Sequence, residues 1–549
     1  MGSIAEYESD IERQGLLEGE GTPSSVLDAK ASRKTRQRRF IHFSVISIII
    51  YVILFRFVVH GNFTKKSSGK KNVIFMVTDG MGPASLSLAR SFRQHRDGLA
   101  IEDILELDKH LIGASRTRSS DSLVTDSAAG ATAFSCGLKS YNGAVGVNPE
   151  KIPCGTILEA LSQEGYLTGL VVTTRITDAT PAAFSAHADW RWQEDLIAEH
   201  QLGHYPLGRS VDLIIGGGRC HFLPTSKGGC RADDLDLTEV AQEEGWSYVA
   251  NRTSFDDLEL GKNVQLPLLA LIAGGDVPYD IDRDSSVYPS LEEQVKTALT
   301  ALTKATEDSE QGFFLMIEGS RIDHAGHHND PAAQVREVLA YDKAYKYVID
   351  FVKNLDTETI VVSTSDHETG GLVTARQLTP AYPDYMWVPQ ALVDAKHSGE
   401  YTRAKVARYS GVDLEEFVKT EVLEKDLGIK DYTSDDVKFI IENKQNCQDY
   451  VLDMVSKRSQ TGWTTHGHSA VDVNIYGYSN KQSTMLELYQ YLGGNHENIE
   501  IGKFMETFTG VNLGQITKII HNTRHSASAS EEKFKLLAED PYHHYGPLE

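Results

Sequence analysis

The chain has 549 residues, a length that allows one large hydrophobic core or roughly two to four smaller ones. Its composition, with 40% hydrophobic and 24% charged residues, is that of an ordinary globular protein. The formal net charge of −23 argues against nucleic acid as the main partner, because a phosphate backbone is bound by clustered Lys and Arg.

A polar tail precedes an apolar segment near the N-terminus. Residues 1–39 are predicted as a cytoplasmic tail, in which ERQGLL places Glu12 ahead of Leu16 and Leu17 at the spacing of a dileucine sorting signal read by an adaptor. Such strings also arise by chance. Residues 40–59, FIHFSVISIIIYVILFRFVV, are apolar over 20 residues, which is long enough to cross a bilayer as a helix. We expect an uncleaved transmembrane anchor rather than a buried core helix or a signal peptide, because a long tail precedes it and no small-x-small cleavage site follows.

The charges around the anchor predict its orientation. Six Lys or Arg residues lie between Lys30 and Arg39 with no acid among them, which favours a cytoplasmic N-terminus and a single-pass type II topology. Residues 60–71 would then be a linker, and the rest of the chain would lie in a lumen. The acceptor sequon Asn251-Arg252-Thr253 agrees with that side of the membrane.

Short β-branched runs alternate with helical stretches after the linker. The runs predicted as strands are residues 72–78, 166–174, 211–217, 313–318 and 359–365. The helices predicted between them include residues 290–306 and 330–355. Continuous apolar strands separated by helices indicate an α/β fold, with a large, mostly parallel sheet covered on both faces.

The same rhythm suggests the domain boundaries. Residues 72–523 are predicted as one catalytic domain. Within it, residues 372–462 lose the alternation and carry tyrosines, prolines and short amphipathic pieces, which predicts an inserted subdomain. Residues 524–549 are polar and are predicted to be a disordered tail that a lumenal protease could remove as a propeptide.

The stretch TDSAAGATAFSCG, from Thr125 to Gly137, starts a predicted helix with an acid and a hydroxyl. One interpretation is an ordinary helix N-cap, in which the side-chain oxygen accepts an N–H group of the first turn. The other is an anion site, in which backbone N–H groups and the positive helix end receive an anion and Ser127 acts as its acceptor. The stretch alone leaves both open.

Acids and imidazoles follow four of the predicted strands. They are Asp79 after the first, Asp178 and Thr180 after the second, Glu318, Asp323, His324 and His327 after the fourth, and Asp366 and His367 after the fifth. Ligands of an open α/β sheet bind outside the carboxyl ends of its strands, so these groups are expected to meet at one edge. So many acids in one place would repel one another unless cations neutralised them.

The ligand types sort the expected metals. Asp323 and His327 are four residues apart, on one face of a helical turn, and a His from TTHGHSAVD, either His466 or His468, would complete a zinc site. A second such site would combine Asp366, His367 and Asp79. The hard oxygen donors Glu318, Thr180 and a shared Asp79 suit magnesium.

Five cysteines leave at least one unpaired. Cys220 and Cys230 flank a short Gly-rich loop that a disulfide could close. Cys136 is predicted to be a buried free thiol.

The ordered motifs DGMG, TDSAAGATA, TDATPAAF, IEGSRIDHAGH, TSDHETGG and THGHSAVDV resemble the alkaline phosphatases. The resemblance covers roughly residues 72–512, and with the anchor and dileucine tail it is greatest to the vacuolar, membrane-bound members of that family. It implies an α/β catalytic domain with a crown-like insertion, a homodimer in the vacuole membrane, and broad hydrolysis of phosphate monoesters through a phosphoserine. Two zinc ions and one magnesium ion per chain would be required.

The resemblance also implies a role for each motif residue. Ser127 would be the nucleophile, Asp323, His327 and His468 would hold the first zinc, Asp79, Asp366 and His367 the second, and Asp79, Thr180 and Glu318 the magnesium. Arg191, in AHADWRW, matches the arginine that forks onto two phosphate oxygens. His468 is preferred to His466 because the residues around it resemble the Gly-His-Thr-Gly motif of the family. Asp178 and His324 match positions that vary in the family and are interpreted as tuning metal occupancy and phosphate release.

Three other functions fit parts of the sequence. A phosphodiesterase or nucleotide pyrophosphatase of the same superfamily would share the two-zinc core but lack the magnesium set. A sulfatase is disfavoured because Ser127 is followed by Ala-Ala-Gly-Ala rather than x-Pro-x-Arg. A catalytically inactive membrane scaffold is disfavoured by the intact set of metal ligands.

Overall fold

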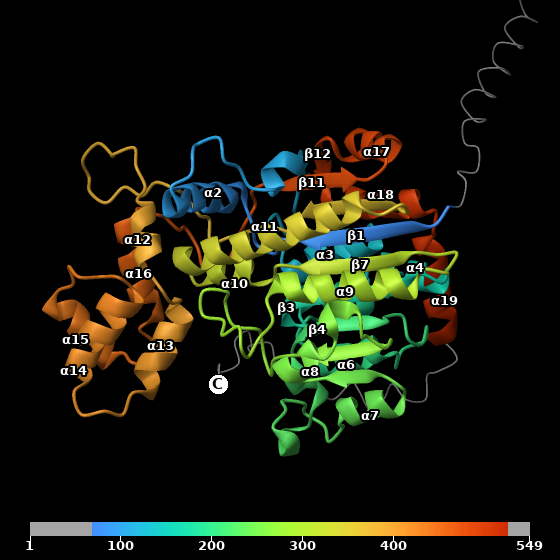
Figure 1. Cartoon of the computed structure of the whole chain (residues 1–549), viewed down its shortest axis with the longest axis horizontal. Coiled ribbons are helices and arrows are strands. Elements are labelled where there is room, and N and C mark those ends of the chain that lie inside the picture. Colours follow the sequence, from blue (N-terminus) through green and yellow to red (C-terminus); the bar gives the residue numbers. More distant parts are fainter. Residues whose placement is uncertain (1–68, 525–549) are drawn as a thin grey trace, which may run out of the picture. The chain divides into compact units, whose positions relative to one another are not determined.

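A ten-stranded sheet forms the centre of residues 69–524, which are the residues that the computed structural model describes (Figure 1). Its strands lie in the order β12 (Gly494–Glu497), β2 (Leu111–Arg116), β11 (Val473–Ser479), β8 (Glu358–Thr364), β1 (Lys71–Val77), β7 (Phe313–Glu318), β3 (Leu167–Arg175), β4 (Leu213–Gly217), β6 (Leu268–Leu271) and β5 (Ser247–Val249). Strand β11 is antiparallel to both of its neighbours, and the other neighbouring pairs are parallel. The predicted α/β fold with a mostly parallel sheet is therefore confirmed.

The five predicted strands correspond to β1, β3, β4, β7 and β8, and the two predicted helices to α9 (Leu291–Ala305) and α11 (Pro331–Lys353). The remaining strands lack a strong sequence signal. Strands β5, β6 and β12 have three or four residues each, which is too short for a period to show. Strand β11, VNIYGYS, mixes polar residues and glycine into its pattern because it lies near one end of the sheet.

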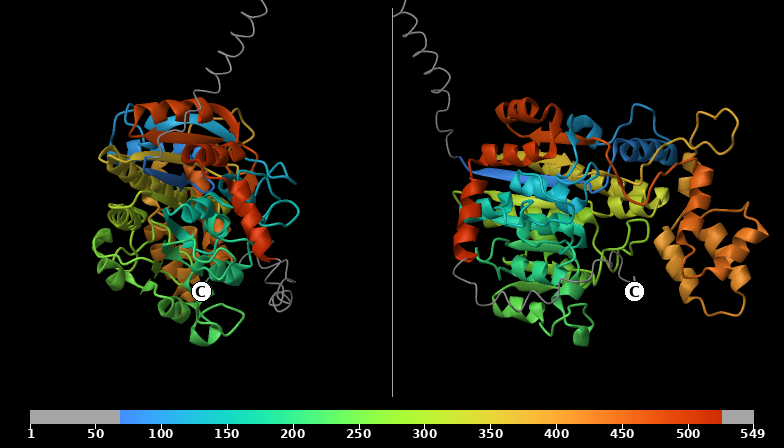
Figure 2. Two further views of the ribbon diagram at one scale, coloured as in Figure 1. Left: turned by 90° about the vertical axis from the view of Figure 1, so that its right-hand side faces the viewer. Right: turned by 180° about the vertical axis from the view of Figure 1, so that it is seen from behind.

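Alternate side chains of β1 enter two different hydrophobic cores. Val73, Phe75 and Val77 pack on one face of the sheet with α3 (Ser127–Cys136), α4 (Ile157–Gln163), α5 (Ala179–Ser185) and α18 (Asn498–Thr509). Ile74 and Met76 pack on the other face with α9 and α11. Helices therefore cover both faces, as Figure 1 and Figure 2 show. Burial on both faces explains why the strand is apolar along most of its length.

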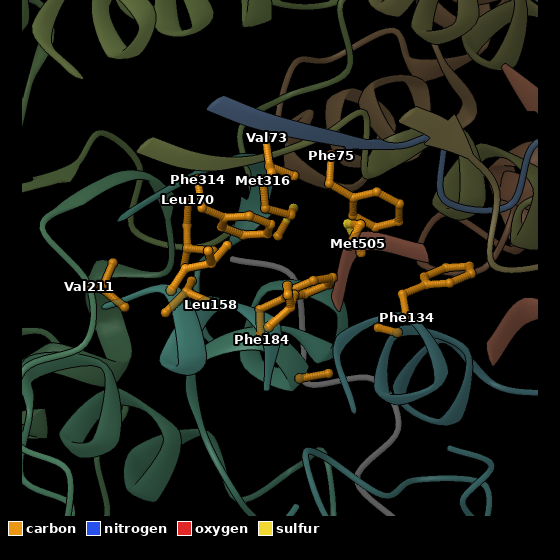
Figure 3. Close-up of a cluster of buried hydrophobic side chains, with 14 of the residues drawn as sticks. Val73, Phe75, Phe134, Leu158, Leu170, Phe184, Val211, Phe314, Met316 and Met505 are labelled. Atoms are coloured by element: carbon orange, nitrogen blue, oxygen red, sulfur yellow. The ribbon is translucent and has the colours of Figure 1, made fainter. Parts of the chain in front are cut away.

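Phe75 lies near the centre of the first core. Its ring centroid is 5.4 Å from that of Phe134 on α3 and 5.6 Å from that of Phe184 on α5 (Figure 3). None of the Phe75 side chain is exposed. This contact fixes the two helices α3 and α5 beneath the same strand, and both helices start at the carboxyl edge of the sheet.

The segment expected as an inserted subdomain contains the helices α12 (Pro389–Asp394), α13 (Gly399–Arg408), α14 (Leu414–Phe417), α15 (Ser434–Glu442) and α16 (Gln448–Ser459), drawn in orange in Figure 1. A π-helical segment, Val418–Asp426, follows α14. These helices share a third hydrophobic core, which also takes in Phe92 of α2 (Pro83–Asp97) and Val335 of α11. The segment is thus packed onto two helices of the sheet domain.

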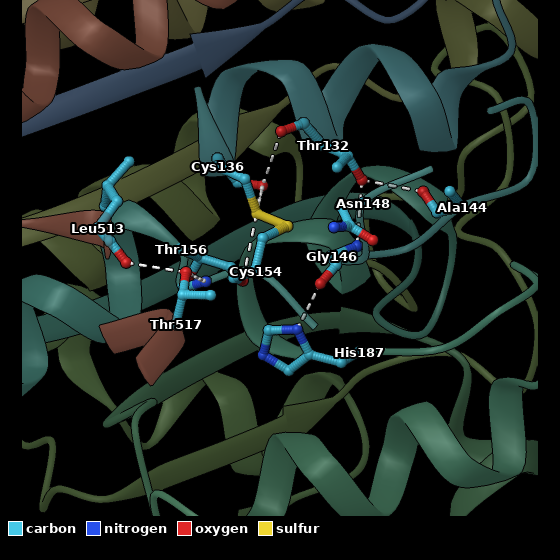
Figure 4. Close-up of a disulfide and its surroundings, with 12 residues drawn as sticks. Thr132, Cys136, Ala144, Gly146, Asn148, Cys154, Thr156, His187, Leu513 and Thr517 are labelled. Carbon is cyan, nitrogen blue, oxygen red and sulfur yellow. Dashed lines mark hydrogen bonds between the residues drawn. A yellow bond between two sulfur atoms is a disulfide. The ribbon is translucent and has the colours of Figure 1, made fainter. Parts of the chain in front are cut away.

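Two disulfides are present, Cys136–Cys154 and Cys220–Cys230 (Figure 4 shows the first). The pair predicted around the Gly-rich loop is confirmed, whereas the prediction that Cys136 is a free thiol is wrong. Cys136 ends α3 and meets a cysteine 18 residues later, just ahead of α4, a pairing that only the tertiary fold brings about. Within residues 69–524, Cys447 is the free cysteine, and it is buried.

The predicted tail, transmembrane anchor and most of the linker, as well as the C-terminal tail, lie outside the described residues. A search of the described helices finds none with the length and apolar character needed to span a bilayer. The sequon residue Asn251 lies within the described part, where it is exposed and caps the short helix α8 (Arg252–Asp256).

The position of Phe75 predicts a large effect on stability. We expect Phe75→Ala to lower the free energy of unfolding by about 3 to 5 kcal/mol, because it leaves a cavity between the sheet and two helices. Urea denaturation of the purified protein measures this loss. Ile101→Ala is the matched control, because 84% of Ile101 is exposed, and its effect should stay within about 0.5 kcal/mol. Equal losses in both variants would contradict this account of the core.

Candidate active site

The predicted site residues lie at the carboxyl ends of four neighbouring strands, β8, β1, β7 and β3. Asp79 follows β1 by two residues, and Glu318 is the last residue of β7. Asp366 and His367 follow β8, and Thr180 lies in the first turn of α5, just beyond β3. Because these strands are parallel and adjacent, segments that are up to about 290 residues apart in the chain meet at one edge.

The first group consists of Asp79, Asp366 and His367, all of which are buried. The Nε2 atom of His367 lies 3.2 Å from Asp366 Oδ2, 3.5 Å from Asp79 Oδ1 and 3.1 Å from Ser127 Oγ. Ser127 is the first residue of α3, and Asp126 caps that helix by accepting a hydrogen bond from the Ala129 N–H (2.9 Å). The N-cap interpretation is therefore confirmed, with Asp126 as the cap, and Ser127 faces the cluster.

The second group consists of Asp323, His327 and His468. Asp323 and His327 are four residues apart on α10 (Arg321–His327), and their Oδ2 and Nε2 atoms are 3.3 Å apart. His468, at the start of β10 (His468–Ser469), places its Nε2 atom 3.6 Å from Asp323 Oδ1 and 3.1 Å from His327 Nε2. His466 is exposed, and its Nδ1 atom pairs instead with the His327 carbonyl oxygen at 2.7 Å. The structure thus brings His468, and not His466, into this group.

The three imidazoles are held in one orientation by their Nδ1 atoms. His468 Nδ1 lies 2.7 Å from the Thr125 carbonyl oxygen, and His327 Nδ1 contacts the His466 carbonyl oxygen. A carbonyl oxygen only accepts, so both Nδ1 atoms must carry hydrogen. In the neutral rings the Nε2 lone pairs of His327 and His468 therefore point at one another across 3.1 Å. Two facing lone pairs beside a carboxylate are favourable when a cation or a proton lies between them.

Thr369 links the two groups, and the sequence did not identify it. Its hydroxyl donates to Asp323 Oδ1 and lies 3.1 Å from His367 Nδ1. Since the hydroxyl hydrogen is directed to Asp323, the His367 Nδ1–H donates to the Thr369 oxygen, which leaves the His367 Nε2 lone pair facing Asp79, Asp366 and Ser127. The only signal for Thr369 was its place two residues after His367 in TSDHETGG.

Several oxygen atoms of the predicted ligands have no hydrogen-bond partner within the described part of the chain. They are Asp79 Oδ1, Asp366 Oδ2 and Thr180 Oγ1, and all three are buried. A buried oxygen without a partner is costly. Divalent cations would supply the missing partners, so the donor set fits the zinc and magnesium ligands expected from the sequence.

The pKa values of the acids reflect the same concentration of charge. Burial, followed by the charges of Asp366 and Asp323, raises the pKa of Asp79 well above its ordinary value. Burial and the nearby Asp178 and Asp366 carboxylates raise the pKa of Glu318 to about 8. Without a cation, these acids cannot all ionise near neutral pH.

On the two imidazoles His327 and His468, a proton can supply the positive charge when no metal is bound. Burial opposes a charged ring, yet Asp323 raises the pKa of His327 to about 9. Burial and the charges of His367 and His327 lower the pKa of His468 to about 3. One proton therefore serves the His327–His468 pair when no metal is bound.

Two glycines permit the close packing of these segments. Gly80 has a φ of +77°, and a Cβ atom there would lie 2.5 Å from the Asp323 Cα atom. A Cβ atom on Gly130 of α3 would lie 2.9 Å from the Asp366 Cβ atom. The run of small residues after Ser127 thus lets α3 approach the segment of Asp366 directly.

Arg191 lies between the caps of two helices. Its Nη2 atom donates to Asp178 Oδ1 at 3.0 Å, and its Nη1 atom donates to Asp126 Oδ2 at 3.4 Å. Asp178 caps α5, as Asp126 caps α3. The guanidinium therefore lies beside the start of the helix that carries Ser127, where a fork of N–H groups can receive an anion.

Asp178 and His324 are neighbours, with His324 Nε2 4.0 Å from Asp178 Oδ2. A second acid, Asp276, lies 3.6 Å from His324 Nδ1. Sequence reasoning missed Asp276 because it follows the short strand β6, whose four residues were not recognised as a strand.

Comparison with known proteins identifies the relatives of the chain. The family model described as Alkaline phosphatase matches residues 70–511. The repressible alkaline phosphatase of Saccharomyces cerevisiae is 56% identical over 539 residues, which cover 94% of this chain and 95% of that protein. The crystal structure of a cold-active alkaline phosphatase from a psychrophilic Shewanella species superposes with a TM-score of 0.67 at 29% identity, covering 80% of this chain and 99% of the other. A mutant alkaline phosphatase from the Antarctic bacterium TAB5, with Mg bound in its M3 site, has a TM-score of 0.56 at 26% identity and covers 81% and 99%.

The raised pKa values predict how metal-free stability depends on pH. Between pH 7 and 9 the folded protein without metal keeps protons on Glu318 and His327 that the unfolded chain has already lost, so stability should fall as pH rises through about 8 and 9. Thermal unfolding of chelator-treated protein measures this change. Glu318→Gln should reduce the slope, and protein loaded with zinc and magnesium should show little of it. A melting temperature that rises between pH 7 and 9, or an equal dependence on pH with and without metal, would contradict the raised pKa values of Glu318 and His327.

Proposed function

The chain belongs to the alkaline phosphatase family, an enzyme family that hydrolyses phosphate monoesters, and from that premise we propose a metal-dependent hydrolysis of broad specificity through a phosphoserine on Ser127. One observation carries this proposal. Two partly buried imidazoles, His327 and His468, place their Nε2 atoms next to one another and beside Asp323. A third, His367, places its Nε2 atom beside Ser127 and two further carboxylates. A serine hydroxyl in that position is adjacent to a site built for a cation.

The proposed metal sites correspond to the two groups of acids and imidazoles and to the buried oxygens that have no hydrogen-bond partner. The first zinc would be held by Asp323, His327 and His468, the second by Asp79, Asp366 and His367, and magnesium by Asp79, Thr180 and Glu318. Magnesium in the TAB5 relative supports the third site. When bound, such cations lower the pKa of a nearby hydroxyl and neutralise charge on an attacking or leaving oxygen.

The residues of the chain supply position and orientation. Ser127 Oγ attacks phosphorus in line, so that an O–P bond to Ser127 forms as the bond to the leaving oxygen breaks. The first N–H groups of α3 and the Arg191 guanidinium stabilise the equatorial oxygens, on which negative charge accumulates. Water then attacks the phosphoserine from the vacated side and returns the hydroxyl to Ser127.

The proposed mechanism gives each group one of the two reacting oxygens. The Ser127 hydroxyl lies against His367 in the first group, and the leaving oxygen would face the second group, which holds His327 and His468. Nothing among these residues recognises the organic part of a phosphate ester, which supports broad specificity.

Cellular placement is part of the proposal and rests on the sequence. The run at residues 40–59 would anchor the protein in the vacuole membrane with the catalytic domain in the lumen, and Glu12, Leu16 and Leu17 would be read by a sorting adaptor. A homodimer is proposed from the family resemblance. The match to the yeast protein over 94% of the chain supports a shared organisation from tail to catalytic domain.

A phosphodiesterase or nucleotide pyrophosphatase of the same superfamily is the alternative enzyme, and an inactive membrane scaffold is the alternative without catalysis. The buried Thr180 hydroxyl and Glu318 carboxylate favour the monoesterase, because the magnesium set would have no role in the diesterase. The complete set of ligand atoms disfavours the scaffold.

Replacing the nucleophile tests the mechanism. Ser127→Ala should lower kcat for an aryl phosphate by at least about 1,000-fold while leaving fold and metal content nearly unchanged. Ser135→Ala is the matched control, because Ser135 is a buried serine on the same helix. Circular dichroism and metal analysis accompany the kinetics. A Ser127→Ala protein that keeps its full rate would remove Ser127 from the mechanism.

Removing metal tests the cofactor assignment. Treatment with a chelator should abolish hydrolysis of an aryl phosphate monoester, and zinc together with magnesium should restore it more fully than either ion alone. The same samples are assayed on an aryl phosphodiester, for which we expect a rate at least about 100-fold lower. Faster cleavage of the diester would favour the alternative enzyme, and activity that survives complete metal removal would exclude the proposed sites.

A further inference from the structure

Arg175, at the end of β3, collects carboxylates from three separate segments. Its Nη1 atom lies 2.9 Å from Asp276 Oδ1, its Nε atom 2.9 Å from Glu194 Oε2, and its Nη2 atom 3.3 Å from Asp178 Oδ2. The Arg175 backbone N–H also donates to Asp276 Oδ1 at 2.9 Å. The side chain is therefore held in one conformation at the carboxyl edge of the sheet.

Two arginines share the carboxylate of Asp178. Its Oδ1 atom accepts from Arg191 Nη2, and its Oδ2 atom faces Arg175 Nη2. The Asp178 carboxylate is thus neutralised by one arginine at each oxygen. Arg191, at Oδ1, is the one proposed to bind phosphate, and Arg175 lies at Oδ2.

We propose that Arg175 is a positioning residue for Arg191 and thereby sets the affinity of the site for phosphate. This inference rests on the proposed function, in which Arg191 binds the phosphate oxygens. Without Arg175, the full negative charge of Asp178 would hold Arg191 more strongly and would repel an incoming phosphate dianion. With Arg175 in place, Asp178 holds Arg191 weakly enough for its guanidinium to be shared with phosphate.

The exposure of the two arginines limits the size of the effect. About a quarter of each side chain is accessible, 25% for Arg175 and 27% for Arg191, so solvent screens their charges in part. The change in phosphate affinity should therefore be modest.

Glu194 has the opposite effect on Asp178 to that of Arg175, because it offsets the positive charge of Arg175. It begins α6 (Glu194–Leu202), and besides Arg175 its Oε2 atom accepts from the Thr177 hydroxyl at 2.5 Å and lies 3.2 Å from His221 Nε2. Its charge takes up part of the positive charge of Arg175. A neutral glutamine can keep the contacts to Arg175 and Thr177 through its amide oxygen while leaving more of the Arg175 charge for Asp178.

The experiment measures kcat and KM for an aryl phosphate and Ki for inorganic phosphate, with metal-loaded full-length protein at constant ionic strength. Arg175→Gln should raise KM and Ki by about threefold to tenfold, with kcat changed less than about twofold and metal content unchanged. Arg175→Lys should fall between wild type and Arg175→Gln, because Lys offers one point charge in place of a fork. Glu194→Gln should lower Ki.

Arg252→Gln is the matched control. Arg252 is 23% exposed and also binds two carboxylates, those of Glu293 and Asp256, but it belongs to α8 and contacts none of the site residues. It should change stability without changing Ki. If Arg175→Gln does not fold, the Ki of Glu194→Gln for phosphate decides: a lower Ki supports the inference, and an unchanged or higher Ki contradicts it.

Two results would overturn the inference: an unchanged Ki in both Arg175→Gln and Glu194→Gln, or an equal change in Arg252→Gln. In both cases the wild type still hydrolyses the ester, so the proposed function stands. A wild-type protein that does not hydrolyse phosphate monoesters would overturn the proposed function and this inference together.

Discussion

The concentration of ionisable groups at one edge of the sheet is the constraint on which the rest of the site depends. Buried acids repel one another, and the facing imidazole nitrogens of His327 and His468 require a positive charge between them. The surrounding structure serves this arrangement. Thr369 and two backbone carbonyls orient the imidazole rings. Gly80 and Gly130 have no side chains that would push the segments of Asp323 and Asp366 away. Helix α3 presents its positive end to the site.

The topology of the sheet explains why groups so distant in sequence meet. Strands β8, β1, β7 and β3 are neighbours, although β1 lies near the start of the described chain and β8 comes almost 300 residues later. Their parallel direction brings all four carboxyl ends to the same edge. One hydrophobic core on each face of the sheet holds the strands and the helices α3, α5 and α10 in place. Packing away from the site therefore fixes the geometry of the site.

Much of this arrangement could be predicted from the sequence, because long buried strands and motifs at their ends leave clear patterns. The five long strands and the residues of both groups of acids and imidazoles are of this kind. Short strands such as β6 leave no period, and Asp276 beyond it was therefore missed. Thr369 was missed because no spacing rule identifies a hydroxyl that bridges two site residues, here Asp323 and His367. The Cys136 prediction was wrong because pairing with Cys154 depends on tertiary contact. The preference for His468 over His466 came from the motif around it, and the structure agrees by placing His468 beside Asp323 and His327.

Helix α3 carries Ser127 at one end and Cys136 at the other. Its ten residues span about 15 Å, so the same short helix holds the proposed nucleophile and half of a cystine. The redox state of the compartment in which the chain matures is consequently connected to the placement of the Ser127 hydroxyl. The disulfide ties the far end of the helix covalently to the segment ahead of α4, whereas in a reducing environment that end would keep the hydrogen bonds of Thr132 with Ala144 and Gly146 and its packing contacts.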